Sequence, residues 1–410
     1  MMKYRVRLTP LESYTFGTDQ NFSYPGEDYG KPTYIADTVY FPEQTTLLGM
    51  LKYEILKLKN DDQSSDFVLK DKQNYTSDDN IEIGKMIGVY GFDYKSDTNS
   101  FGQIKSISPV YLVKDLDGYT EPHILIRTPF NHINIKEKED VTEYEPMAMN
   151  EVLVTSYGWT DGPENSCKDE ESDDIRHKGS LKLGKKIPGL IEVDDKENGG
   201  KKQVHQYDTK KWHATSFLDI NNGKLDKNDI FSPHTVTSNW IGGNTTGDDG
   251  LFKTKKVTMT KGYSFGVDVV VDDAVTLPEK SIVKMGKKAA VFKAEFKPVP
   301  DNVEDSLEEK VRQMLCSNAT VLKNNKENNE IWYYALSDLI LADTDYKQFC
   351  IVDEKSVRNI DKDGRKSRFR QNMAASGSVF FAETEEDAPK LENNETLHAI
   401  GYNYLIKIAP

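Results

Sequence analysis

Two stretches of the sequence combine residue types that can hold a polyanion. Residues 14–30, YTFGTDQNFSYPGEDYG, interleave aromatic rings with glycines and small polar residues. The rings offer faces on which bases stack, and glycine and threonine let backbone amides approach an anion. Residues 365–370, RKSRFR, place four cations within six positions, and Ala-Ser-Gly-Ser follows at 375–378. Four cations with few acids among them suit a phosphate backbone, so these stretches predict binding of a single-stranded nucleic acid.

Both stretches also have a purely structural interpretation. The aromatic residues of 14–30 could pack on the core as a capping loop. The cations of 365–370 could form a solvated surface loop. Composition alone leaves both interpretations open.

Signs of catalysis are few. The sequence has no Gly-x-Ser-x-Gly, no phosphate loop and no His-Glu-x-x-His. Neighbouring acids such as Asp272 and Asp273 point to opposite faces of a strand and would not share a site. The cysteines are odd in number and far apart, which favours buried thiols over a disulfide or a zinc site. Seven histidines are scattered without metal-ligand spacing: His123, His132, His177, His205, His213, His234 and His398. We therefore expect a protein that is not an enzyme and has no cofactor or metal.

Composition indicates a soluble globular protein. The 410 residues suggest two domains with large insertions. No run approaches the roughly 18 apolar residues of a membrane helix, and the N-terminus has no apolar signal core, so we expect a cytoplasmic protein. The net charge of −14 argues against nucleic acid at first, but the acids are clumped at 169–174 and 383–389. Because charges interact mainly within about 8–10 Å, a local basic groove is compatible with an acidic body.

Hydrophobic patterning in the first half predicts a strand, a long irregular loop, a helix and further strands. The helix at 45–59 would bury Leu47, Leu51, Ile55 and Leu58 and turn Lys52 to the other face. The predicted strand is 2–11, the loop is 12–37, residues 60–80 are loose, and the later strands are near 83–94, 105–115 and 122–127.

The second half predicts a similar order after a polar break at 160–208, which reads as a partly disordered insertion. A helix at 302–322 follows a strand pair at 255–273 and 281–299, and Ser306 with Glu309 offers a capping box. The closing segments 331–342, 347–353, 377–383 and 397–408 read as strands. We therefore predict an α+β fold with antiparallel sheets, divided into a domain at 1–159, a linker or insertion at 160–208 and a domain at 209–410.

The stretch FPEQTTLLGMLKYEI, residues 41–55, begins the predicted helix with three polar residues, 44–46, which we call the helix mouth. Gly49 follows in the next turn. Thr45 or Thr46 could cap the helix and leave first-turn amides aimed outward. Gly49 costs about 1 kcal/mol of helix stability relative to alanine. That cost suggests that something approaches the first turn closely.

In their order along the chain, several segments resemble the Cmr three family of the RAMP superfamily, whose members are subunits of type III-B CRISPR effector complexes. In that family a Pro-x-x-(Ser/Thr)-Thr-Leu-x-Gly segment opens the first helix, as residues 42–49 do here. AASGSV at 374–379 corresponds to the family's Pro-Ala-Gly-Ser-Val strand start, without the proline. The segments at 245–257, 261–273 and 285–296 also resemble the family, and the resemblance covers residues 3–59 and 235–408.

The resemblance implies two ferredoxin-like (RRM-like) RAMP domains with long insertions, whose antiparallel sheets face a cleft. It implies a non-catalytic subunit for antiviral defence that holds the 5′ tag of the CRISPR RNA (crRNA). The implied partners are crRNA, the large polymerase-like subunit and a backbone RAMP subunit, with target RNA nearby and no membrane. Target-RNA cleavage and cyclic-oligonucleotide synthesis would belong to other subunits.

The residues expected to contact RNA come from the aromatic loop, the helix mouth, the basic cluster and the Ser-Gly-Ser turn. They are Tyr14, Phe16, Gly17, Thr18, Asn21, Phe22, Gln44, Thr45, Thr46, Gly49, Lys52, Arg365, Lys366, Arg368, Arg370, Ser376, Gly377 and Ser378. Two alternatives stay open. One is a RAMP-type endoribonuclease that processes precursor crRNA, for which His398 is the histidine nearest a matched motif. The other is a structural assembly subunit that never touches RNA.

Overall fold

The computed structural model describes residues 1–17, 34–62, 67–69, 75–88, 91–115, 123–134, 144–146, 149–151, 186–188, 190–194, 201–205, 216–219, 224–239, 251–299, 306–317, 331–342, 346, 348–358 and 370–408. In this part of the chain strands outnumber helices, and nearly all strand pairs are antiparallel. The predicted mixed class with antiparallel sheets is confirmed.

A nine-stranded sheet dominates the described residues, in the order β15-β14-β7-β6-β18-β1-β20-β19, with β5 also paired to β18. Its strands are β1 (Met2–Pro10), β5 (Ile104–Ile107), β6 (Tyr111–Lys114), β7 (His123–Arg127), β14 (Ser216–Asp219), β15 (Lys224–Asp226), β18 (Tyr263–Val271), β19 (Lys280–Met285) and β20 (Ala290–Pro298). The first strand lies in the middle because Val6 pairs with Val267 on one side and with Phe296 on the other. Half-buried and buried residues alternate along β1, which explains why its sequence pattern predicted a strand.

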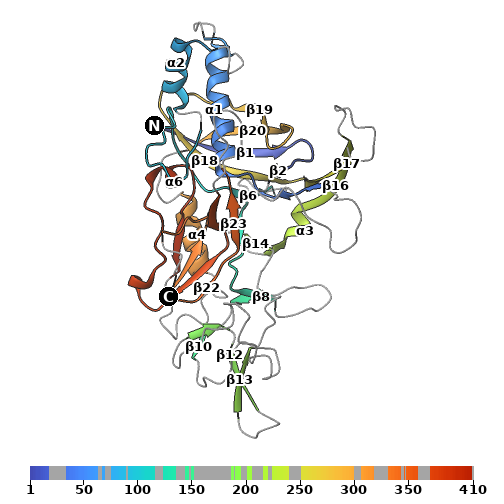
Figure 1. The fold of residues 1–410 in the computed structure, drawn as a ribbon, viewed down its shortest axis with the longest axis vertical. Helices are drawn as coiled ribbons and strands as arrows, with labels where there is room; N and C mark the ends of the chain where they lie inside the picture. The colour runs from blue at the N-terminus through green and yellow to red at the C-terminus, as the bar shows by residue number, and fades with distance from the viewer. Residues whose placement is uncertain are drawn as a thin grey trace, which may run out of the picture.

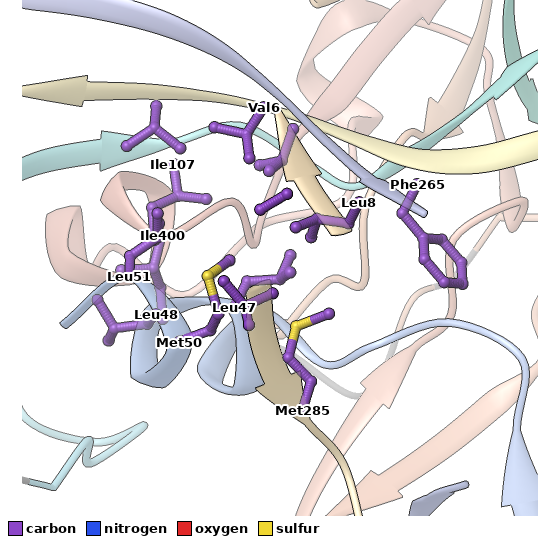
Figure 2. Packing of buried hydrophobic residues seen from close by; sticks show 14 of the residues in the cluster. Val6, Leu8, Leu47, Leu48, Met50, Leu51, Ile107, Phe265, Met285 and Ile400 are labelled. Atoms are coloured by element: carbon purple, nitrogen blue, oxygen red, sulfur yellow. The ribbon is translucent and has the colours of Figure 1, made fainter. Parts of the chain in front are cut away.

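Helix α1 (Gln44–Asp61) covers one face of this sheet beside α2 (Ser77–Ile87) (Figure 1). Figure 2 shows Leu47, Leu48 and Leu51 of α1 packed against Val6 and Leu8 of β1. Leu47 and Leu8 are fully buried, and burying one such side chain contributes about 1.5–3 kcal/mol.

A second core forms between other strands of the large sheet and the C-terminal elements. Tyr111, Val113 and Ile126 of β6 and β7 join a cluster with Val311 of α4 and Trp332 of β21. The C-terminal elements are α4 (Leu307–Ser317), β21 (Ile331–Ala335), β22 (Cys350–Ile351), a 3-10 turn (Glu385–Asp387), α6 (Glu395–Ala399), β25 (Val379–Ala382) and β26 (Leu405–Ile408), of which α6 packs on the first core through Leu397. The four strands form a sheet in the order β22-β25-β21-β26.

Smaller sheets complete the described fold. The long hairpin of β16 (Phe231–Asn239) and β17 (Leu251–Met259) follows the short α3 (Lys227–Ile230), and β17 also pairs with β3 (Tyr34–Ala36). The two-stranded sheets pair β2 (Phe16–Gly17) with β4 (Thr38–Val39), β8 (His132–Asn134) with β9 (Tyr144–Pro146), β10 (Met149–Glu151) with β11 (Lys186–Pro188), β12 (Leu190–Asp194) with β13 (Lys201–His205), and β23 (Glu354–Val357) with β24 (Gln371–Ala374).

Two predicted strands are wrong in part. Residues 83–87 belong to α2, whose capping box between Thr76 and Asp79 and whose first-turn acids favour a helix. Residues 395–399 form α6, which Asn394 caps by accepting a hydrogen bond from the Thr396 amide. Both are short amphipathic segments in which a helical and a strand period are hard to distinguish.

The predicted strand pair at 255–273 and 281–299 is four strands. Gly262, with φ of 91°, ends one strand and lets β18 enter the large sheet while β17 stays with β16. The segments then meet through β1, which pairs with both β18 and β20.

Three further sequence predictions concern the start of α4, the segment 160–208 and the domain division. One of the two hydrogen bonds of the predicted capping box of α4 is present, since Ser306 Oγ accepts from the Glu309 amide at 3.2 Å, whereas the Glu309 carboxylate accepts from Arg312 and Gln313. The described residues of 160–208 are β11, which pairs with β10, and the paired strands β12 and β13; the rest of that segment lies outside the described residues. The domain division stays a prediction, although strands from both predicted domains share the large sheet. Among the described residues, no helix is long and apolar enough to cross a membrane.

Candidate nucleic-acid interface

Two of the predicted motifs meet at a polar contact between α1 and the C-terminal elements. We name this contact the junction and define it by Glu43, Asp338 and Lys355. The Lys355 ammonium lies 2.6 Å from Glu43 Oε1 and 2.5 Å from Asp338 Oδ2. The other oxygen of Asp338 accepts a hydrogen bond from the Ser376 amide at 2.9 Å. The junction therefore joins the residue before α1 to the Ser-Gly-Ser turn, 333 positions later in the chain (376 minus 43).

Burial controls the charges of the junction. It disfavours all three charged forms, whose side chains are only 15–25% exposed. At Asp338 the Lys355 ammonium and the Ser376 amide outweigh burial, and the pKa falls below its usual value. At Lys355 the two carboxylates outweigh burial, and the pKa rises. Burial prevails at Glu43 and raises its pKa, since it shares its cation with Asp338.

Gln44 ties the start of α1 to two other chain segments. Its side-chain nitrogen donates to the carbonyls of Ser108 at 3.3 Å and Gly401 at 3.4 Å. With the amide rotated by half a turn, it donates instead to Ile400 O at 3.2 Å and accepts from the Val110 amide at 3.0 Å. In either orientation the buried Gln44 fixes the helix entry rather than facing a ligand.

The rest of the helix mouth differs from its prediction. The N-cap residue is Glu43, and its side chain makes no capping hydrogen bond. The prediction that Thr45 or Thr46 caps α1 is wrong, because the backbone is already helical at Gln44 and both threonines lie inside the first turn. Both are half-buried, and Gly49 is exposed with open space where a Cβ would stand. Nothing in the described residues approaches Gly49.

The Ser-Gly-Ser turn is held from several directions. Ser376 Oγ donates to Leu336 O at 2.9 Å, and Ser376 O accepts from Arg127 Nη1 at 3.2 Å. The fully buried Ser378 donates from its hydroxyl to Ala375 O at 2.6 Å. Gly377 has φ of 97°, and a Cβ there would lie 2.7 Å from the Phe130 ring. The turn is therefore rigid, and Ser376 is its half-buried member.

The described start of the aromatic loop belongs to the core. Tyr14 is fully buried and Phe16 is 2% exposed, and both rings contact Phe265 and Phe292. In this structure neither ring presents a face to a base, which agrees with the structural interpretation of this loop. Gly17 is exposed in β2, whereas Thr18, Asn21 and Phe22 lie outside the described residues.

Of the cations predicted to bind RNA, one is buried, one is exposed and three lie outside the described residues. Lys52 is not on a solvent face as predicted: it is 6% exposed, and its ammonium lies 5.9 Å from the centre of the Phe101 ring. Burial lowers the pKa of Lys52 to about 8. Arg370 is exposed at the start of β24. Arg365, Lys366 and Arg368 lie outside the described residues.

Two of the described histidines contact neighbouring side chains. The His398 ring stacks on Tyr404 at 4.0 Å between ring centres, and burial lowers its pKa. His123 Nδ1 lies 2.8 Å from Asp219 Oδ2, both largely buried. No group of acids, histidines and cysteines among the described residues could hold a metal ion.

Sequence reasoning missed the junction itself. Glu43, Asp338 and Lys355 are common surface types separated by long intervals, and no spacing rule links them. Tyr402 extends the same network, since its hydroxyl lies 3.4 Å from Glu43 Oε2 and 3.2 Å from the Tyr94 hydroxyl. The available signal was position: Glu43 stands inside the Pro-x-x-Thr-Thr motif, and Lys355 precedes the basic cluster.

Comparison with known proteins gives one family. The family model described as CRISPR-associated protein (Cas_Cmr3) matches residues 6–409. A search of curated proteins finds no match. Two cryo-EM structures of the type III-B Cmr-beta complex bound to cognate target RNA, one also holding AMPPnP, are similar at 14% identity and a TM-score of 0.43. They cover 98–99% of this chain and 96–99% of theirs. The apo state of that complex gives a TM-score of 0.24 at 13% identity, over 73% of this chain and 98% of that chain.

Proposed function

The chain belongs to the CRISPR-associated Cas_Cmr3 family, and we propose that it is a non-catalytic, crRNA-binding subunit of a type III-B effector complex. In this role it holds the 5′ tag of the crRNA and docks the large polymerase-like subunit to the backbone RAMP filament. Target RNA lies nearby in the same assembly, which serves antiviral defence. The match over residues 6–409 is the observation that carries the proposal.

The geometry around the Ser-Gly-Ser turn supports an RNA-facing role for one segment. The rigid turn is anchored by Asp338 and Arg127, and β24 beside it begins next to the exposed Arg370. Single-stranded RNA is held by cations and backbone amides that contact its phosphates. We therefore place the tag along Arg370, Ser376 and the basic residues 365–368, with Gly49 and Thr46 of α1 at the edge of the same cleft.

We propose further that the chain contains two ferredoxin-like halves. The first combines β1, α1 and the strands that flank β1, and α1 covers one sheet face. The second combines α4 with β21, β25 and β26. Each half has one well-marked helix on an antiparallel sheet, which is the arrangement that the sequence resemblance implies.

Charge reversal of the basic cluster tests the RNA assignment. The full chain with Arg365, Lys366, Arg368 and Arg370 each changed to Glu should co-purify with the other complex subunits but retain much less small RNA than wild type. Sequencing of the RNA bound to wild type should give a discrete small RNA with a constant 5′ end. A matched control changes four exposed lysines outside this loop, Lys85, Lys261, Lys280 and Lys284, to Glu together, and it should retain RNA like wild type. If RNA retention by the charge-reversed complex equals that of wild type, the assignment for this loop is wrong.

The two alternatives make different predictions. An endoribonuclease would cut repeat RNA without metal, and cleavage would fall when His398 is changed to Ala. A structural subunit would assemble normally, and crosslinking of bound RNA would never map to this chain. Absence of cleavage by the isolated chain together with RNA crosslinks to residues 365–376 would exclude both.

A further inference from the structure

Away from the junction, three lysines and a buried hydroxyl gather around a small hollow. It is lined by Glu12, Ser13, Thr15, Thr254, Lys256, Lys287, Lys288 and Ala290, and we name it the lysine hollow. Its volume is about 80 Å³, several times what one water molecule needs. The lining residues come from the segment between β1 and β2, from β17, and from the turn between β19 and β20 with the start of β20. Figure 1 shows these strands.

Hydrogen bonds fix the frame of the lysine hollow. Tyr14 and Val257 exchange two backbone hydrogen bonds at 2.9 Å, and Thr15 Oγ1 donates to Lys255 O at 3.0 Å. The amide of Lys287 donates to Thr15 O at 2.9 Å. The three walls are therefore held together, and the lysines extend from a defined backbone.

The turn that carries Lys287 and Lys288 has an unusual backbone. Gly286, Lys288 and Ala289 have φ of 73°, 62° and 53°, in the left-handed region that lysine and alanine rarely adopt. A Cβ at Gly286 would lie 2.6 Å from Thr15 O, so only glycine allows this approach. Strained backbone of this kind clusters at binding sites, where the surrounding structure enforces it.

Thr254 gives a second, independent observation. It is 3% exposed, and its hydroxyl has no hydrogen-bond partner in the described part of the chain. Leaving a buried hydroxyl without a partner is unfavourable, and native structures usually satisfy such groups with protein, water or a ligand. Because Thr254 lines the hollow, a small rearrangement of its side chain would let an oxygen atom bound there accept this hydrogen bond.

The charges select an anion. Lys256 and Lys287 make no ion pair with any described residue, and Lys288 adds a third positive charge. The carboxylate of Glu12 also lines the hollow, but one of its oxygens accepts a hydrogen bond from the Val291 amide at 2.9 Å. With three ammonium groups against one carboxylate, the hollow favours a compact anion with several acceptor oxygens. Lysines bind phosphate in this way, as point charges around its oxygens.

We propose that the lysine hollow binds one backbone phosphate of single-stranded RNA, with Thr254 as a hydroxyl donor and Lys256, Lys287 and Lys288 as counter-charges. This inference rests on the proposed function, because it names a second RNA contact of the same subunit. It places part of the bound RNA beside β2 and the segment that follows β1.

The first test compares two double variants of the full chain in binding a fluorescein-labelled single-stranded RNA over a range of salt. Lys287→Ala/Lys288→Ala should weaken binding about tenfold and reduce the slope of log affinity against log salt by about 0.7 for one lost phosphate. The control, Lys261→Ala/Lys284→Ala, removes the same charge from exposed lysines outside the hollow and should bind like wild type. Equal affinity and slope for both variants would overturn the inference while leaving the proposed function intact. RNA binding absent from wild type would instead overturn the proposed function.

A second test separates a phosphate of RNA from a free anion. Inorganic phosphate should raise the melting temperature of wild type but not of Lys287→Ala/Lys288→Ala, and it should compete with the labelled RNA. Stabilisation by phosphate without competition would mean an adventitious ion only and would overturn the RNA assignment.

Thr254→Val tests the hydroxyl. Valine keeps the shape of threonine and removes a group that makes no hydrogen bond within the described chain, so the variant should melt at or above the wild-type temperature. Its affinity for the labelled RNA should fall severalfold. Unchanged affinity in a folded Thr254→Val protein would contradict the role given to Thr254.

Discussion

The junction and the lysine hollow use the same residue types in opposite ways. At the junction one lysine lies between two carboxylates, and Ser376 and Tyr402 complete a network in which the polar groups have partners. At the hollow three lysines surround space, and the hydroxyl of Thr254 has no partner in the described residues. A satisfied network fixes a fold, whereas an unsatisfied one is where a ligand can add hydrogen bonds. The start of α1 and the Ser-Gly-Ser turn thus meet at a structural contact, and the lysine hollow is the stronger candidate for anion binding.

The largest expected effect comes from breaking the junction. Lys355→Met leaves Glu43 and Asp338 as two mostly buried carboxylates without their shared cation. Removing one partner of a buried ion pair costs about 3–5 kcal/mol of unfolding free energy. Denaturant unfolding of the variant should show this loss.

A matched lysine shows whether the cost belongs to the junction. Lys284→Met removes an exposed lysine of β19 and should unfold like wild type. If Lys355→Met unfolds at the same denaturant concentration as Lys284→Met, the junction does not stabilise the fold. The distinction between a stabilising junction and a ligand-binding hollow is then wrong.

The sequence predicted the elements better than their contacts. The leucine spacing gave α1 to within one residue at its start, and the alternation of residues 2–11 gave β1, because both patterns follow one buried face. The aromatic pattern at 14–16 was consistent with either stacking or core packing, and only the pairing of Tyr14 with Val257 determines that it is core. Lys52 was misplaced because helical periodicity gives the direction of a side chain and does not show that Phe101 covers that direction. Glu43, Asp338 and Lys355 could not be joined, since contacts between distant positions depend on topology.

Lys52 is a third kind of lysine. It is buried, and its ammonium lies near the Phe101 ring. Its pKa falls from 10.5 to about 8 on folding, because burial disfavours the ammonium. Below pH 8 the ammonium is charged in both the folded and unfolded chain, and folding carries the full cost of burying it. Between about pH 8 and 10.5 the unfolded chain binds more protons than the folded chain, so unfolding free energy should rise with pH, by up to about 3 kcal/mol.

The variant Lys52→Met should abolish this rise and be more stable than wild type near pH 7. Urea unfolding at a series of pH values measures both effects, and Lys59→Met on the same helix should keep the wild-type profile. A Lys52→Met protein that is less stable at pH 7 would mean that the ammonium has a stabilising role, like that of Lys355.

The smallest expected effect on stability concerns Gly49, which lies beside the helix mouth with open space around it. A Cβ at this exposed glycine meets no atom within 4 Å, so Gly49→Ala should stabilise the isolated chain by about 1 kcal/mol. Gly84 in α2 is an equivalent exposed glycine with the same free space, and Gly84→Ala should give the same gain. The two variants should differ only in the assembled complex. There Gly49→Ala should weaken retention of RNA or of a neighbouring subunit, since an added methyl group blocks close approach over the first turns of α1, whereas Gly84→Ala should not. Equal retention of RNA and of neighbouring subunits by the two variants would mean that nothing approaches Gly49 in the complex. The helix mouth would then be purely structural, like the junction.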